Sequence, residues 1–235
     1  MAAIVAAVIG LFVGAAIWNL ARRQANRISL FGDPAISPGD WLPFAGFGTH
    51  PLDAVTGERR TIWQTVFEVA VGAYFGAIGW KFGFSADLFM IILFSLPLLL
   101  IGLVDFWTRL IHTKVIYVGI ALGIAFAAAD GLGSVFDSLL GMALATGVFI
   151  FLFALAILIY RNINVVPFGL GDVYLAAMIG AMVGIDLVLQ ALVLGIFLAG
   201  VILGALLVAR TLSRKQAVAY GPYLCLGALL TMLIS

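Results

Sequence analysis

Residues 86–104 read ADLFMIILFSLPLLLIGLV, and this mainly apolar stretch decides the fold class. A helix that crosses a hydrocarbon core of roughly 30 Å needs about 20 such residues. Further apolar runs lie near 2–20, 62–80, 115–130, 137–160, 173–186, 187–209 and 217–234. Their apolar residues are continuous and do not alternate with period two, which excludes a β-barrel. The sequence therefore predicts an all-α integral membrane protein, a polytopic bundle of about eight transmembrane helices.

The composition excludes several other classes of protein. The chain has 235 residues, of which 64% are hydrophobic and 10% charged, with a mean hydropathy of +1.22. Soluble domains carry roughly 25% charged residues, so an ordinary cytosolic enzyme is excluded. The net charge of +1 provides no basic field for nucleic acid, and the expected surroundings are a lipid bilayer. The lone Cys225 can form no internal disulfide. We expect a single polytopic domain over residues 1–235.

The basic residues predict the orientation of the bundle. Arg22 and Arg23 follow the first apolar run and do not precede it, so this run is read as a retained helix with its N-terminus outside. Eight alternating spans then put loops 21–61, 105–114, 160–172 and 210–216 in the cytoplasm. These loops hold eleven basic residues: Arg22, Arg23, Arg27, Arg59, Arg60, Arg109, Lys114, Arg161, Arg210, Arg214 and Lys215. The opposite side holds only Lys81, as the positive-inside rule requires.

Two features of the runs bear on how the helices are arranged. The run 173–186 is short and shares its boundary at Asp186 with the next, so the sixth and seventh spans have the least certain ends. Small residues at i, i+4 spacing permit close helix contact, and they occur at Gly10/Gly14, Gly72/Gly76, Gly119/Gly123, Gly180/Gly184 and Gly200/Gly204.

The segment 21–61 is rich in Gly, Pro and Asp and predicts a small cytoplasmic loop region.

Three carboxylates are not explained by solvated helix ends. Charged residues at predicted outer helix ends are read as solvated: Lys81, Asp87, Asp130, Asp137 and Asp186. Glu68, Asp105 and Asp172 instead adjoin or enter apolar runs. Because an ionisable group at membrane depth is costly, each is a candidate functional residue.

Asp105 and Asp172 are predicted to reach the same membrane face at the same depth. Two carboxylates brought close together can share one proton, because two negative charges in such close contact cannot both be present. One can then act as a base on water while the other polarises a carbonyl, which is aspartyl peptide hydrolysis and uses no metal. Two structural alternatives stay open. Asp172 is also a good N-cap, and Asp105 has Arg109 four residues on as a partner for a surface ion pair.

These segments resemble the type IV prepilin peptidase family of G-x-G-D membrane aspartyl proteases. The family's first motif, Asp with Arg at plus four and Ile-Pro-Asn at plus six to eight, is matched by Asp105, Arg109 and Ile111, with His112 and Thr113 in place of Pro-Asn. Its G-x-G-D-V-K-L motif is matched by Gly169, Gly171, Asp172, Val173 and Leu175, with Tyr174 in place of Lys.

The resemblance extends over nearly the whole chain, in order. The stretch AYGPYLCLGALL is similar to the family's F-G-P-x-L-x-x-G segment through Gly221, Pro222 and Gly227. DWLPFAG and RRTIWQTVFEV are similar to the family's first cytoplasmic loop and second helix, and Glu68 stands at the family's glutamate position. Glu68 is either a functional carboxylate of that type or a hydrogen-bond partner in helix packing.

The resemblance implies an aspartic endopeptidase of a prokaryotic inner membrane that cleaves the basic leader from type IV prepilin or pseudopilin precursors. Asp105 and Asp172 are the implied catalytic residues, supported by Gly169, Gly171, Arg109 and Glu68. No cofactor is implied for cleavage. Many family members also N-methylate the new N-terminus with S-adenosylmethionine.

One departure concerns metal binding. Bacterial members typically carry two Cys-x-x-Cys pairs in the first loop, which hold zinc, and residues 21–61 contain no cysteine. The loop's His50 and carboxylates (Asp33, Asp40, Asp53 and Glu58) lack a ligand spacing. No zinc is therefore expected.

Two rival functions stay open. A proton-coupled transporter would use its intramembrane carboxylates as a relay, but it would be expected to carry them deep in several helices. An assembly protein that kept the fold and lost activity is left open by the altered Pro-Asn, the altered Lys and the missing cysteines. Cleavage of a co-expressed prepilin separates all three functions.

Overall fold

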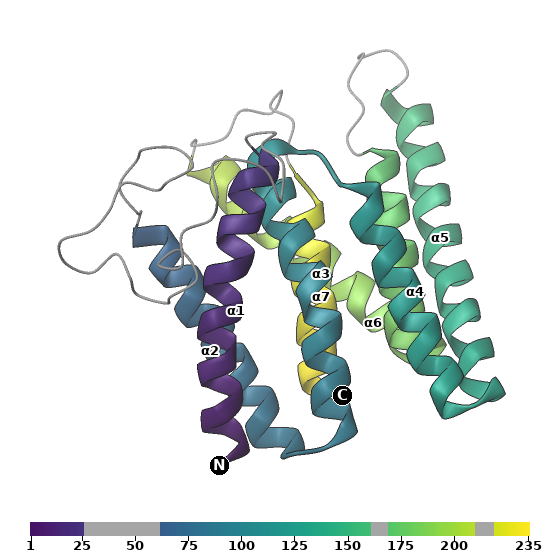
Figure 1. Cartoon of the computed structure of the whole chain (residues 1–235). Helices are drawn as coiled ribbons and strands as arrows, with labels where there is room; N and C mark the ends of the chain where they lie inside the picture. The colour runs from purple at the N-terminus through teal and green to yellow at the C-terminus, as the bar shows by residue number, and fades with distance from the viewer. Residues whose placement is uncertain (26–61, 161–168, 210–218) are drawn as a thin grey trace. The chain divides into compact units, whose positions relative to one another are not determined.

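The computed structural model describes residues 1–25, 62–160, 169–209 and 219–235, and within these ranges the regular structure is helical (Figure 1). The helices are α1 (Ala2–Ala25), α2 (Ile62–Phe82), α3 (Ala86–Thr108), α4 (Thr113–Asp130), α5 (Leu132–Tyr160), α6 (Leu170–Val208) and α7 (Gly221–Ile234). The all-α fold class is therefore confirmed. Of the four predicted cytoplasmic loops, 105–114 is described, and most of 21–61, most of 160–172 and all of 210–216 lie outside the described residues.

The chain separates into two compact units, Met1–Leu96 and Pro97–Ser235, and α3 passes from one to the other at Pro97. Each unit is described by itself. The single polytopic domain expected over the whole chain stays a prediction.

Unit 1 is built on close contact between α1 and α2, which lie side by side (Figure 1). A β-carbon added at Gly10 would lie 2.9 Å from Cα of Gly72, and one added at Gly14 would lie 2.9 Å from Cα of Glu68. Only glycine therefore fits at these contacts, which confirms that the first two small-residue pairs mark a tight helix interface. Gly119 and Gly123 likewise contact α6 in unit 2, whereas added β-carbons at Gly200 and Gly204 would meet nothing within 4 Å.

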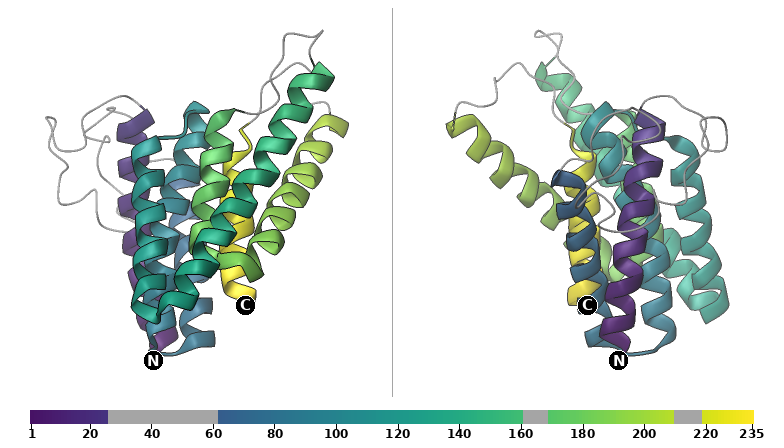
Figure 2. Two further views of the ribbon diagram at one scale, coloured as in Figure 1. Left: turned by 90° about the vertical axis from the view of Figure 1, so that its right-hand side faces the viewer. Right: turned by 60° about the vertical axis from the view of Figure 1, so that its left-hand side comes forward.

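Unit 2 contains a single helical run, α6, that is too long to cross a membrane straight. Its 39 residues would extend about 58 Å at 1.5 Å per residue, roughly twice the hydrocarbon core. The run is broken at Gly184, whose φ of 74° and ψ of 179° are open essentially only to glycine. The two arms of α6 therefore meet at an angle, and the second arm runs back from the break as it diverges from the first (Figure 2). The predicted boundary at Asp186 lies two residues beyond the observed break.

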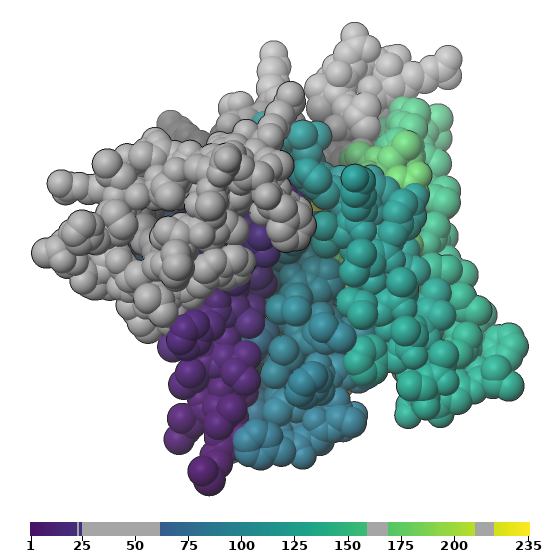
Figure 3. All heavy atoms as spheres, in the orientation of Figure 1, coloured from purple at the N-terminus to yellow at the C-terminus, as the bar shows by residue number. Residues whose placement is uncertain are grey.

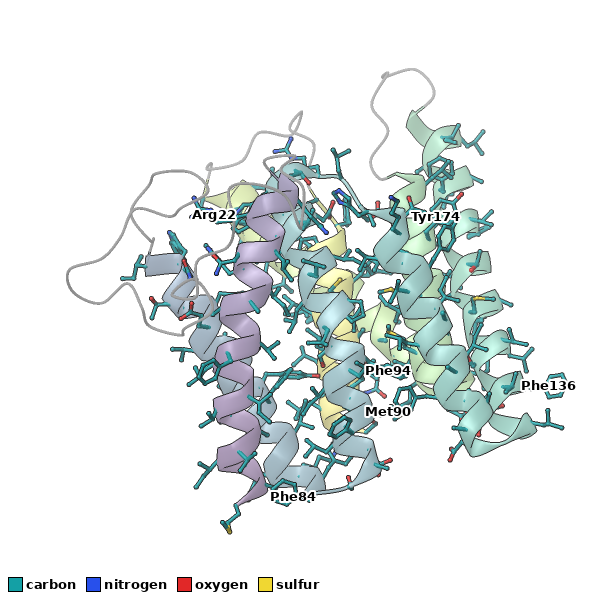
Figure 4. All side chains as sticks on the ribbon, viewed as in Figure 1. Arg22, Phe84, Met90, Phe94, Phe136 and Tyr174 are labelled. Atoms are coloured by element: carbon teal, nitrogen blue, oxygen red, sulfur yellow. The ribbon has the colours of Figure 1, made fainter. Side chains whose placement is uncertain are left out.

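Five of the described helices are long and apolar enough to span a membrane: α1, α3, α4, α5 and α6. The shorter α7 is also apolar, with 14 residues. The chain is thus a multi-pass membrane protein, while the count of eight spans stays a prediction. Large apolar side chains face outward on α5, where Phe136 points away from the helices (Figure 4), and α4 and α5 form much of one face of unit 2 (Figure 3).

Candidate active site

Asp105 lies in the last turn of α3, where the helix is about to end. Its backbone oxygen accepts a hydrogen bond from the Arg109 N–H at 2.8 Å, and Arg109 has a φ of 54°, in the left-handed region that stops a helix. The Asp105 side chain is only 4% exposed. Its Oδ2 accepts a hydrogen bond from the backbone N–H of Gly221 at 3.1 Å, at the start of α7.

Asp172 lies in the first turn of α6 and helps to begin that helix. The N-cap is Gly169, whose N–H donates to Asp172 Oδ2 at 3.0 Å, while the Asp172 N–H donates to the Gly169 oxygen at 3.1 Å. The interpretation of Asp172 as the N-cap itself is therefore wrong, because α6 begins three residues before the predicted 173. Asp172 is the third helical residue, and its carboxylate reaches back to cap the turn, as acidic residues in a first turn do.

The two aspartates come together at one end of unit 2. The charge of Asp172 acts on the Asp105 carboxylate, and both charges act on the buried Cys225 thiol, one turn into α7. The connection from α3 to α4 also contacts the G-x-G-D turn, since a β-carbon added at Gly171 would lie 3.2 Å from Cβ and Cδ1 of Ile111. The structure thus joins the two motifs that are separated by 67 positions in the sequence.

Burial determines what this pair of carboxylates can do. Asp172 is 7% exposed, so neither charge is well hydrated, and two like charges held close together in such a place cannot both be ionised cheaply. Each carboxylate has one oxygen, Oδ2, held by a backbone N–H, which fixes its orientation. The arrangement suits one ionised carboxylate working beside a protonated one.

Arg109 is exposed and Asp105 is buried, which contradicts the alternative of a surface ion pair between them. Arg109 still supplies a favourable charge to the Asp105 carboxylate. Its second contribution is structural, because its left-handed backbone directly follows the end of α3 and begins the connection that contains Ile111. The supporting role of Arg109 in catalysis stays a prediction.

Glu68 belongs to unit 1, on α2. It is 1% exposed and accepts a hydrogen bond from the Gln64 side-chain nitrogen at 2.9 Å, with α1 in contact at Gly14. This contact supports the helix-packing alternative, and a functional role for Glu68 stays a prediction.

The remaining candidate residues are exposed or lie outside the described residues. Tyr174, in place of the family Lys, is 45% exposed on α6 (Figure 4), and His112 is exposed at the N-cap of α4. All five predicted solvated residues (Lys81, Asp87, Asp130, Asp137 and Asp186) are exposed. His50 and the loop carboxylates Asp33, Asp40, Asp53 and Glu58 lie outside the described residues. In the part of the chain that is described, no three His, Cys, Asp or Glu side chains gather as metal ligands.

The sequence gives no indication of the contact between Gly221 and Asp105. Gly221 is noticeable only as part of a motif, and a hydrogen bond across 116 positions has no local signature.

Comparison with known proteins identifies one family and one relative. The model of the Type IV leader peptidase family matches residues 91–209, just over half of the chain, and this range contains both aspartates. The chain is 23% identical over 199 residues to a "Prepilin leader peptidase/N-methyltransferase" of Bacillus subtilis (strain 168), covering 84% of this chain and 77% of that protein. No solved structure matches the chain.

Proposed function

Because the chain belongs to the type IV leader peptidase family, we propose that it is an aspartic endopeptidase that cleaves the basic leader from type IV prepilin or pseudopilin precursors. Asp105 and Asp172 form the catalytic pair. The observation that carries this proposal is the pair itself: two buried carboxylates from different helices, each with Oδ2 held by a glycine N–H, and with the charge of Asp172 acting on Asp105.

The chemistry follows from the two protonation states of the pair. The ionised carboxylate takes a proton from a water molecule, and the water oxygen attacks the carbonyl carbon of the scissile peptide. The protonated carboxylate donates its proton to the carbonyl oxygen, which relieves the developing negative charge. The C–N bond then breaks as the proton taken from water passes to the leaving nitrogen, and a hydroxyl proton of the tetrahedral intermediate returns to the carboxylate that had donated one. Leader carboxylate and mature N-terminal amine are the products, and no step requires a metal.

The orientation fits such a substrate. With the N-terminus outside, the predicted cytoplasmic loops carry eleven of the twelve basic residues, and Asp105 and Asp172 lie at that same face of the inner membrane. A Lys/Arg-rich leader stays in the cytoplasm before its apolar helix enters the bilayer. A reporter fused within residues 30–55 should read as cytoplasmic and one after Ser235 as external; opposite readings at both places overturn the orientation.

Methyl transfer is a second candidate activity, favoured by the name of the Bacillus subtilis relative, which includes N-methyltransferase. S-adenosylmethionine would supply the methyl group. The first cytoplasmic loop lies outside the described residues, so no side chain is assigned to this cofactor and no step is derived through it. The absence of cysteine in that loop also keeps our expectation of no bound zinc. Metal analysis of the detergent-purified chain checks it.

The proposed function is tested by co-expressing the chain with a prepilin and following the shortening of the precursor. We expect processing that continues in membranes treated with a chelator. A precursor that stays full-length beside well-accumulated protein would favour the transporter or the inactive assembly protein. Mass spectrometry of the mature N-terminus in the same samples reports whether it is methylated.

A further inference from the structure

Gly221 holds Asp105 from a distant part of the chain. Its N–H donates to Asp105 Oδ2 at 3.1 Å, and both residues are buried. The first N–H groups of a helix have no partner inside that helix, so Gly221, the first residue of α7, has its N–H free for this bond. Pro222 follows and has no N–H, which leaves Gly221 as the donor at the first two helical positions.

Glycine is required here for space. Gly221 is not among the described residues with positive φ, so its backbone is open to other residues. A β-carbon added at Gly221 would instead lie 2.5 Å from Asp105 Oδ2 and 3.1 Å from its Cγ. Atoms do not approach so closely without displacement, and the atoms that would be displaced are those of the carboxylate itself.

We propose that Gly221 is a positioning residue for Asp105, which accepts the Gly221 N–H bond only because position 221 has no side chain. This inference rests on the proposed aspartyl chemistry. The bond fixes Oδ2 and thereby sets the orientation of the whole Asp105 carboxylate. Neighbouring contacts agree, since a β-carbon added at Gly102 of α3 would lie 3.4 Å from Cβ of Cys225, so the two helices are in direct contact.

A double-mutant cycle in thermal stability tests the contact without any measurement of activity. The full chain is purified in detergent and unfolded while its tryptophan fluorescence is followed, for Gly221→Ala, Asp105→Ala and both together. We expect Gly221→Ala to lower the Tm of the wild type by several degrees. In the Asp105→Ala chain the drop should nearly vanish, because only Cβ of residue 105 remains, at an ordinary 3.4 Å. If Gly221→Ala alone does not accumulate, Asp105→Ala should restore its accumulation.

Gly195→Ala is the matched control for displacement of α7. Its β-carbon would lie 2.9 Å from Cα of Leu224 on α7 and does not meet Asp105. Its effect on Tm should therefore be the same in the wild-type chain and in the Asp105→Ala chain. An equal drop for Gly221→Ala in both backgrounds, or failure to accumulate in both, overturns the inference.

Cleavage kinetics then separate positioning from general damage. Gly221→Ala should lower kcat by about 10- to 100-fold and leave KM within about twofold, because a misplaced carboxylate affects the reaction more than leader binding. Gly204→Ala, with open space at its β-carbon, should match the wild type. An unchanged kcat for Gly221→Ala overturns the inference while the proposed function stands. A wild type that does not cleave overturns the proposed function, and the stability cycle then still decides the contact.

Discussion

The start of α6 and the end of α3 each present one buried aspartate, and they hold it in different ways. Asp172 receives its hydrogen bond from Gly169, three residues earlier in the same turn. Asp105 receives the equivalent bond from Gly221, 116 positions later and on another helix. One carboxylate is thus positioned by a local turn that forms with its helix, and the other depends on how α7 packs. The site is complete only when both conditions are met.

The largest effect should come from removing either carboxylate, however it is held. Asp105→Asn and Asp172→Asn should each lower cleavage on the order of 10³-fold or more, because an amide supplies neither the base nor the acid. Processing of a co-expressed prepilin and the amount of protein in membranes are measured together. Asp186→Asn, on an exposed side chain of α6, is the matched control and should cleave normally. Near-normal cleavage by either active-site variant would show that this aspartate has only a structural role.

An intermediate loss of cleavage rate is expected where the start of α6 contacts the connection that follows α3. Gly171→Ala places a β-carbon 3.2 Å from Ile111, so the connection after α3 must shift by a few tenths of an ångström. We expect kcat to fall roughly 3- to 10-fold, measured on purified protein. Adding Ile111→Ala removes two of the three contacted atoms, Cγ1 and Cδ1, and should restore part of the rate. No loss for Gly171→Ala would mean that this contact does not help to position the pair.

The smallest effect is expected at the first glycine of the G-x-G-D turn. Gly169 has φ −100° and ψ 168°, an extended conformation that any residue adopts, and an added β-carbon would meet only the Gly171 nitrogen at 3.8 Å. Gly169→Ala keeps the N–H that binds Asp172, so its cleavage rate should stay within about twofold of the wild type. If Gly169→Ala cleaves as slowly as Gly171→Ala, the backbone of the turn alone does not position Asp172.

The difference between a carboxylate held by a local turn and one held by a distant helix also explains how much of the site could be predicted from the sequence. Continuous apolar runs give the fold class, and the order Gly-Leu-Gly-Asp before an apolar run predicts a helix start with Asp172 as its N-cap. The structure instead begins α6 at Leu170, three residues before the predicted 173, because Asp172 caps the turn from inside the helix. The break at Gly184 needs a positive φ that glycine permits but does not require. The bond from Gly221 to Asp105 arises from packing alone and could not be predicted.

The central claim is that Asp105 and Asp172 work as one pair, and a comparison of single and double variants tests it most directly. Cleavage of purified prepilin is measured for Asp105→Asn, Asp172→Asn and the double variant under single-turnover conditions. Residues that act as a unit are strongly non-additive, so all three variants should share the same residual rate. A double variant that is slower than either single by the product of their separate losses would show two independent contributions and contradict the shared pair.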